Sequence, residues 1–300
     1  MPEPTDTLTH SYLTRSDVRL HRVEAGEGPA VLLLHGFPEF WYSWRHHIPP
    51  FARAGYHVIA PDLRGFGDSD APPDPAAYSI ETLVEDVSAL IASSGQACAH
   101  LVGHDWGGLI AWCVAAWRPD LVRSLTILNA PHPTIYRRVL WRSPQWLRSA
   151  YVPVFMAPGL AERLLLAHGG WLIKEMFRRG AAHRDAVPPD AIRRYVEEAR
   201  RPGRLTGGLN YYRANAHLGF RGVRLPRITA PTLVLWGDRD PALGVNLLDG
   251  LDDVVNHPHV QILRGVGHWV AQEAPDVVTT SLLQFWSSHG AMPSSEPTRA

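Results

Sequence analysis

The feature that most constrains the fold is an aspartate with a glycine two residues before it and another two residues after it, about one third of the way along the chain. Residues 99–110, Ala-His-Leu-Val-Gly-His-Asp-Trp-Gly-Gly-Leu-Ile, predict a short buried strand, a forced turn and a helix that begins near Trp106. The spacing Gly103-x-Asp105-x-Gly107 is that of a nucleophile elbow, where small neighbours let a strand reverse tightly into a helix. The central side chain is therefore expected to point out of the sheet from strained backbone.

The residue at the centre of this turn is an aspartate, where most proteins with such a turn carry serine. A carboxylate can attack a saturated carbon and form an alkyl ester, whereas a serine alkoxide suits acyl carbons. Asp105 thus favours epoxides or alkyl halides as substrates over esters and amides. The competing interpretation is that Asp105 only caps the following helix, because aspartate is a favoured N-cap residue.

The composition gives no sign of a nucleic-acid or membrane partner. The 300 residues suit one α/β domain with an insertion, or two small domains, and the formal net charge is zero. No apolar run is long enough to span a bilayer and residues 1–14 lack the features of a secretory signal, so we expect a cytoplasmic protein. Cys98 and Cys113 lack metal-ligand spacing, and we expect neither a metal nor another cofactor.

Strand and helix patterns alternate over the first 130 residues. A hairpin pattern at 8–23 precedes apolar strand patterns at 29–35, 56–60, 99–104 and 122–128, separated by helical patterns at 40–54, 79–94 and 106–117. This alternation predicts a mostly parallel sheet with right-handed crossovers.

The alternation then stops for about ninety residues that show helical periods only. Helices inserted between two strands would form a lid over the strand ends, where open α/β sheets bind their ligands. A separately folded helical domain is the alternative. The predicted segments are the first part of the core (1–130), the lid (131–226), the second part of the core (227–288) and a disordered polar tail (289–300).

Three titratable residues follow strand patterns directly, namely Asp105, Asp240 and His268. Their order is that of the α/β-hydrolase triad, with the nucleophile first, then the acid, then the histidine that acts as general base. Asp240 is preferred over Asp238, which is closer to its strand and better placed for a turn hydrogen bond. For His268, the alternative is a packed loop histidine bonded to a backbone carbonyl.

An ester on Asp105 would be hydrolysed through an oxyanion that needs hydrogen-bond donors. The backbone N–H of Trp106 and that of Phe37 are the candidate donors. We expect the substrate pocket to be apolar and lined by Phe37, Pro38, Trp106 and Trp269.

Four motifs together carry a family resemblance that covers about residues 13–286: His35-Gly36-Phe37-Pro38-Glu39, Asp62-Leu63-Arg64-Gly65-Phe66-Gly67-Asp68-Ser69, Gly103-His104-Asp105-Trp106-Gly107-Gly108 and Gly267-His268-Trp269. In this order they resemble epoxide hydrolases of the α/β-hydrolase fold, to which haloalkane dehalogenases are related. The resemblance implies a mostly parallel eight-stranded sheet with helices on both faces and an inserted helical lid.

The resemblance also implies two lid tyrosines that hold the epoxide oxygen. Leu209-Asn210-Tyr211-Tyr212-Arg213 matches one motif and assigns Tyr212, because neighbouring helical residues point about 100° apart. The stretch from Ala150 to Gly159 resembles the other and assigns Tyr151, with Tyr136 and Tyr195 as further candidates. A phenol suits protonation of the basic alkoxide that epoxide opening leaves.

The related dehalogenases fit the sequence less well. They usually carry asparagine where this chain has Phe37, and those acting on fluoroacetate carry arginine where it has Trp106. The predicted partners are therefore a lipophilic epoxide and water, with monomer or homodimer left open. A non-catalytic ligand-binding protein on the same fold is the alternative of another class.

Overall fold

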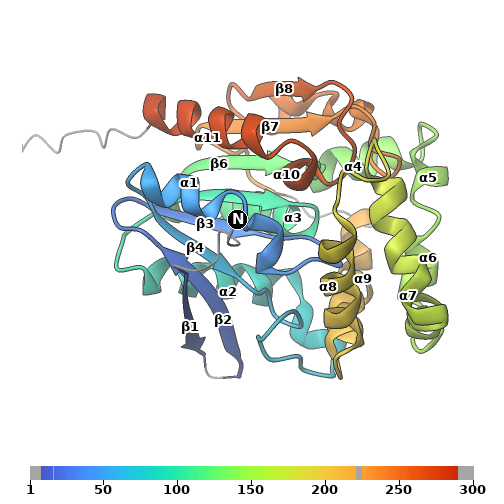
Figure 1. Cartoon of the computed structure of the whole chain (residues 1–300). Helices are drawn as coiled ribbons and strands as arrows, with labels where there is room; N and C mark the ends of the chain where they lie inside the picture. Colours follow the sequence, from blue (N-terminus) through green and yellow to red (C-terminus); the bar gives the residue numbers. More distant parts are fainter. Residues whose placement is uncertain (1–7, 16, 221–224, 290–300) are drawn as a thin grey trace, which may run out of the picture.

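A single mixed sheet forms the centre of the molecule. The computed structural model describes residues 8–15, 17–220 and 225–289. The sheet has eight strands in the order β1-β2-β4-β3-β5-β6-β7-β8 (Figure 1). Their bounds are β1 Thr9–Thr14, β2 Arg19–Ala25, β3 Ala30–Leu34, β4 His57–Pro61, β5 Ala99–His104, β6 Val122–Leu128, β7 Thr232–Gly237 and β8 His259–Leu263.

Most neighbouring strands run parallel. β1 pairs antiparallel with β2, and β2 with β4, while β3, β5, β6, β7 and β8 continue the sheet from β4 in parallel. The predicted α/β-hydrolase fold class is thereby confirmed, including the hairpin at one edge.

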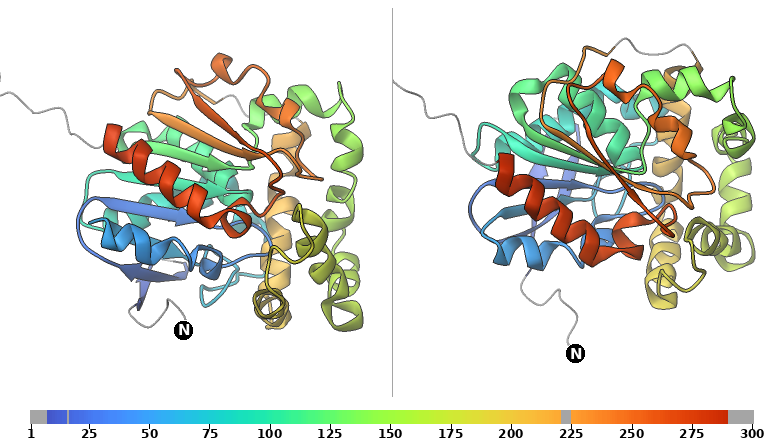
Figure 2. Two further views of the ribbon diagram at one scale, coloured as in Figure 1. Left: turned by 45° about the horizontal axis from the view of Figure 1, so that its top comes forward. Right: turned by 90° about the horizontal axis from the view of Figure 1, so that it is seen from above.

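Helices cover both faces of the sheet, which explains why the central strand β3 is a continuous apolar run. Leu32 and Leu34 of β3 pack in the cluster that holds helices α2 (Ile80–Ser93) and α3 (Trp106–Trp117). The alternate residues of β3 face the other cluster, with helices α1 (Ile48–Arg53) and α11 (Pro275–His289) (Figure 2). This period of two is the ordinary alternation of a strand.

The prediction of one helix over 40–54 is wrong. This stretch forms a 3₁₀ turn, η1 (Trp41–Trp44), followed by the short helix α1. Pro49 and Pro50 lie in the first turn of α1, where their missing N–H groups cost nothing, and they prevent the helix from starting earlier.

In the described part of the segment between β6 and β7, six helices form what we call the helical insertion. They are α4 (Pro133–Leu140), α5 (Gln145–Arg148), α6 (Val152–Met156), α7 (Leu160–Gly180), α8 (Pro189–Arg200) and α9 (Arg204–Phe220). They stack beyond the ends of the strands at one side of the sheet (Figure 1). The lid boundaries at 131 and 226 stay a prediction.

Helix α7 is broken near its middle. His168, Gly169 and Gly170 have φ values of 49°, 71° and 75°, in the left-handed region that favours glycine. Gly170 is required there also because an added Cβ would lie 2.6 Å from a methyl carbon of Val196.

Two further expectations concern the C-terminal tail and membrane-spanning helices. Residues 290–300 of the tail predicted to be disordered lie outside the described residues. Within the described part of the chain, no helix is long and apolar enough to cross a membrane.

Candidate active site

The turn between β5 and α3 has the backbone geometry of a nucleophile elbow. Asp105 has φ 49° and ψ −118°, a conformation that residues with a side chain rarely adopt. The flanking glycines permit the turn, because a Cβ on Gly103 would lie 2.4 Å from the Gly107 carbonyl oxygen. Asp105 occupies the N-cap position of α3, but its carboxylate makes no capping hydrogen bond to the helix, so the interpretation that it serves only as a cap is wrong.

The two carboxylate oxygens of Asp105 have different surroundings. Oδ1 accepts a hydrogen bond of 2.9 Å from the backbone N–H of Phe37. Oδ2 lies 3.9 Å from Nε2 of His268. Trp106 begins α3 directly after the aspartate, so its N–H belongs to the first helical turn, whose amides have no partner within the helix. One oxygen is thus held by an amide while the other faces the imidazole.

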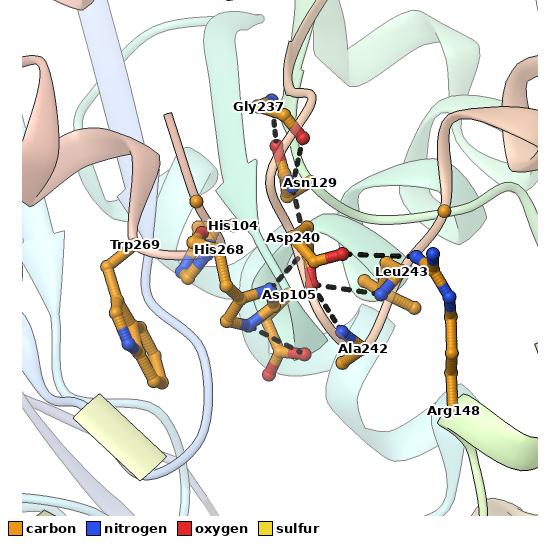
Figure 3. Close-up of polar contacts among 12 residues, drawn as sticks. His104, Asp105, Asn129, Arg148, Gly237, Asp240, Ala242, Leu243, His268 and Trp269 are labelled. Carbon is orange, nitrogen blue, oxygen red and sulfur yellow. Dashed lines mark hydrogen bonds and ion pairs between the residues drawn. The ribbon is translucent and has the colours of Figure 1, made fainter. Parts of the chain in front are cut away.

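The structure brings His268 and Asp240 together behind Asp105 (Figure 3). Nδ1 of His268 lies 2.7 Å from Oδ2 of Asp240. The other carboxylate oxygen of Asp240 accepts hydrogen bonds of 2.8 and 2.9 Å from the N–H groups of Ala242 and Leu243. Asp238 instead accepts a turn hydrogen bond from the Gly265 amide, at 2.7 Å.

Asn129 completes the hydrogen bonds of Asp240, and sequence reasoning missed it. Its side-chain N–H₂ donates to Oδ2 of Asp240 at 2.7 Å, and its Oδ1 accepts from the N–H of Gly237 at 2.7 Å. Asn129 is fully buried, directly follows β6 and has φ 37°. The available signal was a polar residue at the carboxyl end of a parallel strand, the rule that singled out the three triad candidates.

Glu39 and His104 form a second polar pair beside the histidine, also missed. The ring nitrogens of His104 lie 2.8 Å from Oε2 of Glu39 and 2.9 Å from the backbone oxygen of His268. Gln272 donates to Oε1 of Glu39 at 2.7 Å. Burial alone would raise the pKa of Glu39, but the charge of His104 and its hydrogen bond outweigh burial and lower it. This carboxylate therefore helps to fix the His268 backbone.

The surroundings of His268 favour its charged form. Burial lowers the pKa of the imidazole, but the charge and hydrogen bond of Asp240, with further contributions from Asp105 and Glu39, raise it to about 9. His268 is thus an imidazolium at neutral pH when Asp105 is ionised. Because its folded-state pKa exceeds the ordinary 6.5, this stabilises the fold fully below about pH 6.5. The stabilisation is lost as the pH rises through about 9.

Neutralising the nucleophile should release this proton more easily. We expect Asp105→Asn to lower the pKa of His268, because one of the negative charges facing the ring is removed. Titration of the imidazole by nuclear magnetic resonance in both proteins measures the change. An unaltered or raised pKa would contradict the electrostatic coupling between the two residues.

Tyr151 and Tyr212 reach the site from two helices of the insertion. Both line the cavity that contains Asp105, and their ring centroids lie 6.4 Å apart. Burial, with the nearby negative charges, raises the pKa of each phenol well above 10, so both stay protonated. Tyr211 points elsewhere, since its hydroxyl donates to the Arg64 backbone oxygen at 2.8 Å.

The two further tyrosine candidates are engaged elsewhere. The hydroxyl of Tyr136, which also lines the cavity, donates to Oγ of Ser149 at 2.9 Å. The hydroxyl of Tyr195 donates to Oε1 of Gln272 at 3.1 Å, and its ring stacks on Phe177. The arrangement thus places two protonated phenols in the space in front of Asp105.

A cavity of about 390 Å³ lies between Asp105 and the insertion, within the range of small-molecule sites. Its lining is Asp105, Trp106, Leu109, Pro131, Pro133, Tyr136, Leu140, Trp141, Trp146, Ser149, Ala150, Tyr151, Val152, Pro153, Tyr212, Asn215 and Leu243. Most of these side chains are apolar or aromatic. The cavity therefore suits a lipophilic molecule.

Of the four residues predicted to line the substrate pocket, only Trp106 does so, and the prediction is wrong for Phe37, Pro38 and Trp269. Trp106 lines the cavity, but Phe37 and Pro38 border a separate space of about 10 Å³. The ring of Phe37 packs edge-on against Phe155 and Tyr212, so it supports the pocket wall while its amide reaches Asp105. The indole of Trp269 stacks on Phe177, with centroids 4.4 Å apart.

The described residues include no group of three or more histidine, cysteine, aspartate or glutamate side chains that could hold a metal ion. The groups around Asp105 are a carboxylate, an imidazole, two phenols and a backbone amide. Together they can supply a nucleophile, a base, acids and an oxyanion donor.

Comparison with known proteins gives consistent results. A family model described as alpha/beta hydrolase fold matches residues 29–275. The chain is 36% identical to epoxide hydrolase 4 of Mus musculus, over 92% of this chain and 79% of that protein. It is 34% identical to epoxide hydrolase A of Mycobacterium tuberculosis, over 95% of this chain and 98% of that protein.

Solved structures agree. An epoxide hydrolase from Vigna radiata superimposes with a TM-score of 0.82 at 30% identity, covering 95% of this chain and 99% of that one. Epoxide hydrolase A from Mycobacterium thermoresistibile gives a TM-score of 0.80 at 35% identity, covering 94% and 98%.

Proposed function

The chain belongs to the α/β-hydrolase fold family, and we propose that it is an epoxide hydrolase that forms an ester on Asp105 and releases a vicinal diol. The observation that carries this proposal is that two protonated phenols line the same apolar cavity as the Asp105 carboxylate. A carboxylate opposite two protonated donors suits a substrate whose leaving oxygen becomes an alkoxide.

In the first step, Oδ2 of Asp105 attacks an epoxide carbon and the bond between that carbon and the ring oxygen breaks. Tyr151 and Tyr212 donate hydrogen bonds to the ring oxygen, and one of them gives up its proton to it. Oδ1 stays on the Phe37 amide, which leaves Oδ2 as the attacking atom. The product is an alkyl ester with a hydroxyl on the adjacent carbon.

In the second step, His268 takes a proton from water and the resulting hydroxide adds to the carboxyl carbon of Asp105. The oxyanion rests on the amides of Phe37 and Trp106, each worth about 3 to 4 kcal/mol in comparable sites. When the ester bond breaks, His268 gives its proton to the leaving alkoxide and regains one from the new carboxyl group of Asp105, so the diol leaves with the oxygen that came from Asp105. Asp240, held by Asn129, keeps the imidazole oriented.

The raised pKa of His268 is compatible with this sequence. In the free enzyme, the His268 side chain is an imidazolium, because Asp105 and Asp240 are both negative. Ester formation removes the charge on Asp105, so the pKa falls and the imidazolium proton can replace the one lost by the tyrosine. The neutral imidazole then activates water, and collapse of the intermediate restores the imidazolium and the carboxylate. After one cycle the tyrosine, His268 and Asp105 have returned to their starting protonation states.

The substrate class follows from the cavity. A cavity of about 390 Å³ lies within the range of small-molecule sites, and its lining is mostly apolar. An epoxide with an aromatic or medium-length alkyl substituent therefore fits.

Turnover of two substrate series tests the proposal. We expect diol formation from styrene oxide and from longer 1,2-epoxides, and slower or no halide release from 1-haloalkanes of the same length. The catalytically impaired Asp105→Asn variant is the control for uncatalysed hydrolysis. Faster halide release than diol formation would instead assign a dehalogenase. Tight ligand binding without turnover of either series would assign a binding protein.

A further inference from the structure

The outer edge of the insertion is unusually apolar. Among the described residues, eleven large hydrophobic side chains are exposed, and seven of them lie in one stretch of α4 to α7. We call these seven the apolar edge: Trp141, Trp146, Leu147, Val154, Leu160, Leu164 and Trp171. Helices α5, α6 and α7 form the outermost layer on this side in all views (Figures 1 and 2). Clustered exposed apolar groups mark interaction sites.

Helix α5 buries its polar side chain and exposes apolar ones, the reverse of an ordinary surface helix. Its polar residue Gln145 is 1% exposed, whereas Trp146 and Leu147 are 52% and 58% exposed. Gln145 is held inside by its hydrogen bonds to the Ala242 backbone oxygen at 2.6 Å and from the Gly244 N–H at 3.2 Å. The helix therefore directs its apolar side chains outward by construction, which suits an apolar environment on that side.

The same stretch carries a local positive charge that the neutral total conceals. Residues 130–174 contain five arginines and one lysine but a single acid, Glu162. That acid is paired with Arg213 at 2.9 Å. Arg138 of α4 is paired with Asp253 at 2.9 Å. The other cations of the stretch are Arg137, Arg142, Arg148, Arg163 and Lys174. Segments that bind membrane surfaces typically combine tryptophan and arginine with exposed leucine.

A second copy of the chain fits this surface poorly. A twofold interface would place the same patch on both sides, so that arginines would face arginines without acids to compensate. An anionic lipid surface supplies the opposite charge and also takes up the apolar side chains. Charge complementarity thus favours lipid over self-association.

We propose that the apolar edge docks on an anionic lipid membrane. The active-site cavity is continuous with this surface, because Trp141 and Trp146 line it while being 65% and 52% exposed. Docking would open the cavity toward the bilayer, from which a lipophilic epoxide enters. This replaces the expectation, drawn from the net charge, of no membrane partner. The delivery of substrate rests on the proposed function, whereas the docking itself does not.

Co-sedimentation of the full chain with vesicles tests the docking without any epoxide. Phosphatidylcholine vesicles with and without phosphatidylglycerol are compared at low and high salt. We expect binding to the anionic vesicles that weakens with salt. The double variant R142Q/R163Q should bind about 25-fold more weakly, at about fivefold for each arginine. The double variant L147S/L160S should bind at least about tenfold more weakly.

A matched variant, V260S/V277S, removes two exposed valines from β8 and α11 and should bind like the parent protein. Thermal melting of each variant checks that it is folded. Absence of binding to anionic vesicles, or binding that neither the arginine nor the leucine variant weakens, would overturn the proposal. So would a dimer in light scattering that L147S/L160S dissociates, since the edge would then belong to a second copy.

Discussion

Replacing His268 with glutamine is expected to stop the reaction at the ester. Asp105 and both phenols remain, so the epoxide is still opened, but no base is left to activate water. Loss of a general base lowers rates by about 100-fold to 10,000-fold. Diol release should fall by that factor while the ester accumulates on Asp105. Intact-protein mass spectrometry should show a protein heavier by the mass of one epoxide.

The control for this experiment is the double variant Asp105→Asn with His268→Gln, which lacks the carboxylate that would carry the adduct. A His268→Gln protein without adduct, although it still consumes epoxide, would contradict the two-step route. An adduct that persists in the double variant would place the ester on another residue.

Removing the lid phenols should affect the earlier step. Tyr151→Phe and Tyr212→Phe each delete one hydroxyl from the cavity wall and leave the ring in place. The loss of one donor to a developing oxyanion costs about 100-fold to 1,000-fold in rate. We expect a drop of that size in ester formation for each variant, and a larger one for the double variant, because two donors share the alkoxide.

Tyr136→Phe is the matched control, since Tyr136 lines the same cavity but its hydroxyl donates to Ser149. Single-turnover mixing with His268→Gln as the background measures ester formation alone. If both Tyr151→Phe and Tyr212→Phe react as fast as Tyr136→Phe, the assignment of the electrophilic pair is wrong.

The elbow could be predicted from sequence because its geometry depends on local residues. Gly103 is required by a contact inside the turn itself, with the Gly107 carbonyl, and its spacing from Asp105 is readable. Gly107 is required by the backbone of Leu34 and His35 at the end of β3, so its cause is not local although its spacing is. Strand β3 is equally readable, because burial on both faces leaves only apolar residues in it. The tyrosine pair came from a resemblance to a family motif, not from periodicity.

Other parts depend on contacts between distant segments and left little sequence signal. Asn129 meets Asp240 only because β6 and β7 are neighbours in the sheet. Trp269 follows the histidine but turns to Phe177 of α7, which no local pattern indicates. Phe37 contributes its amide rather than its ring, a distinction that depends on side-chain packing in the insertion.

The central claim is that water attacks the carboxyl carbon of Asp105 and never the epoxide. A single turnover in ¹⁸O-labelled water, with enzyme in excess over styrene oxide, tests it most directly. The account predicts that ¹⁸O appears in the peptide that contains Asp105, while the diol carries unlabelled oxygen from the enzyme. Label in the diol after that first turnover, with an unlabelled Asp105 peptide, would contradict it.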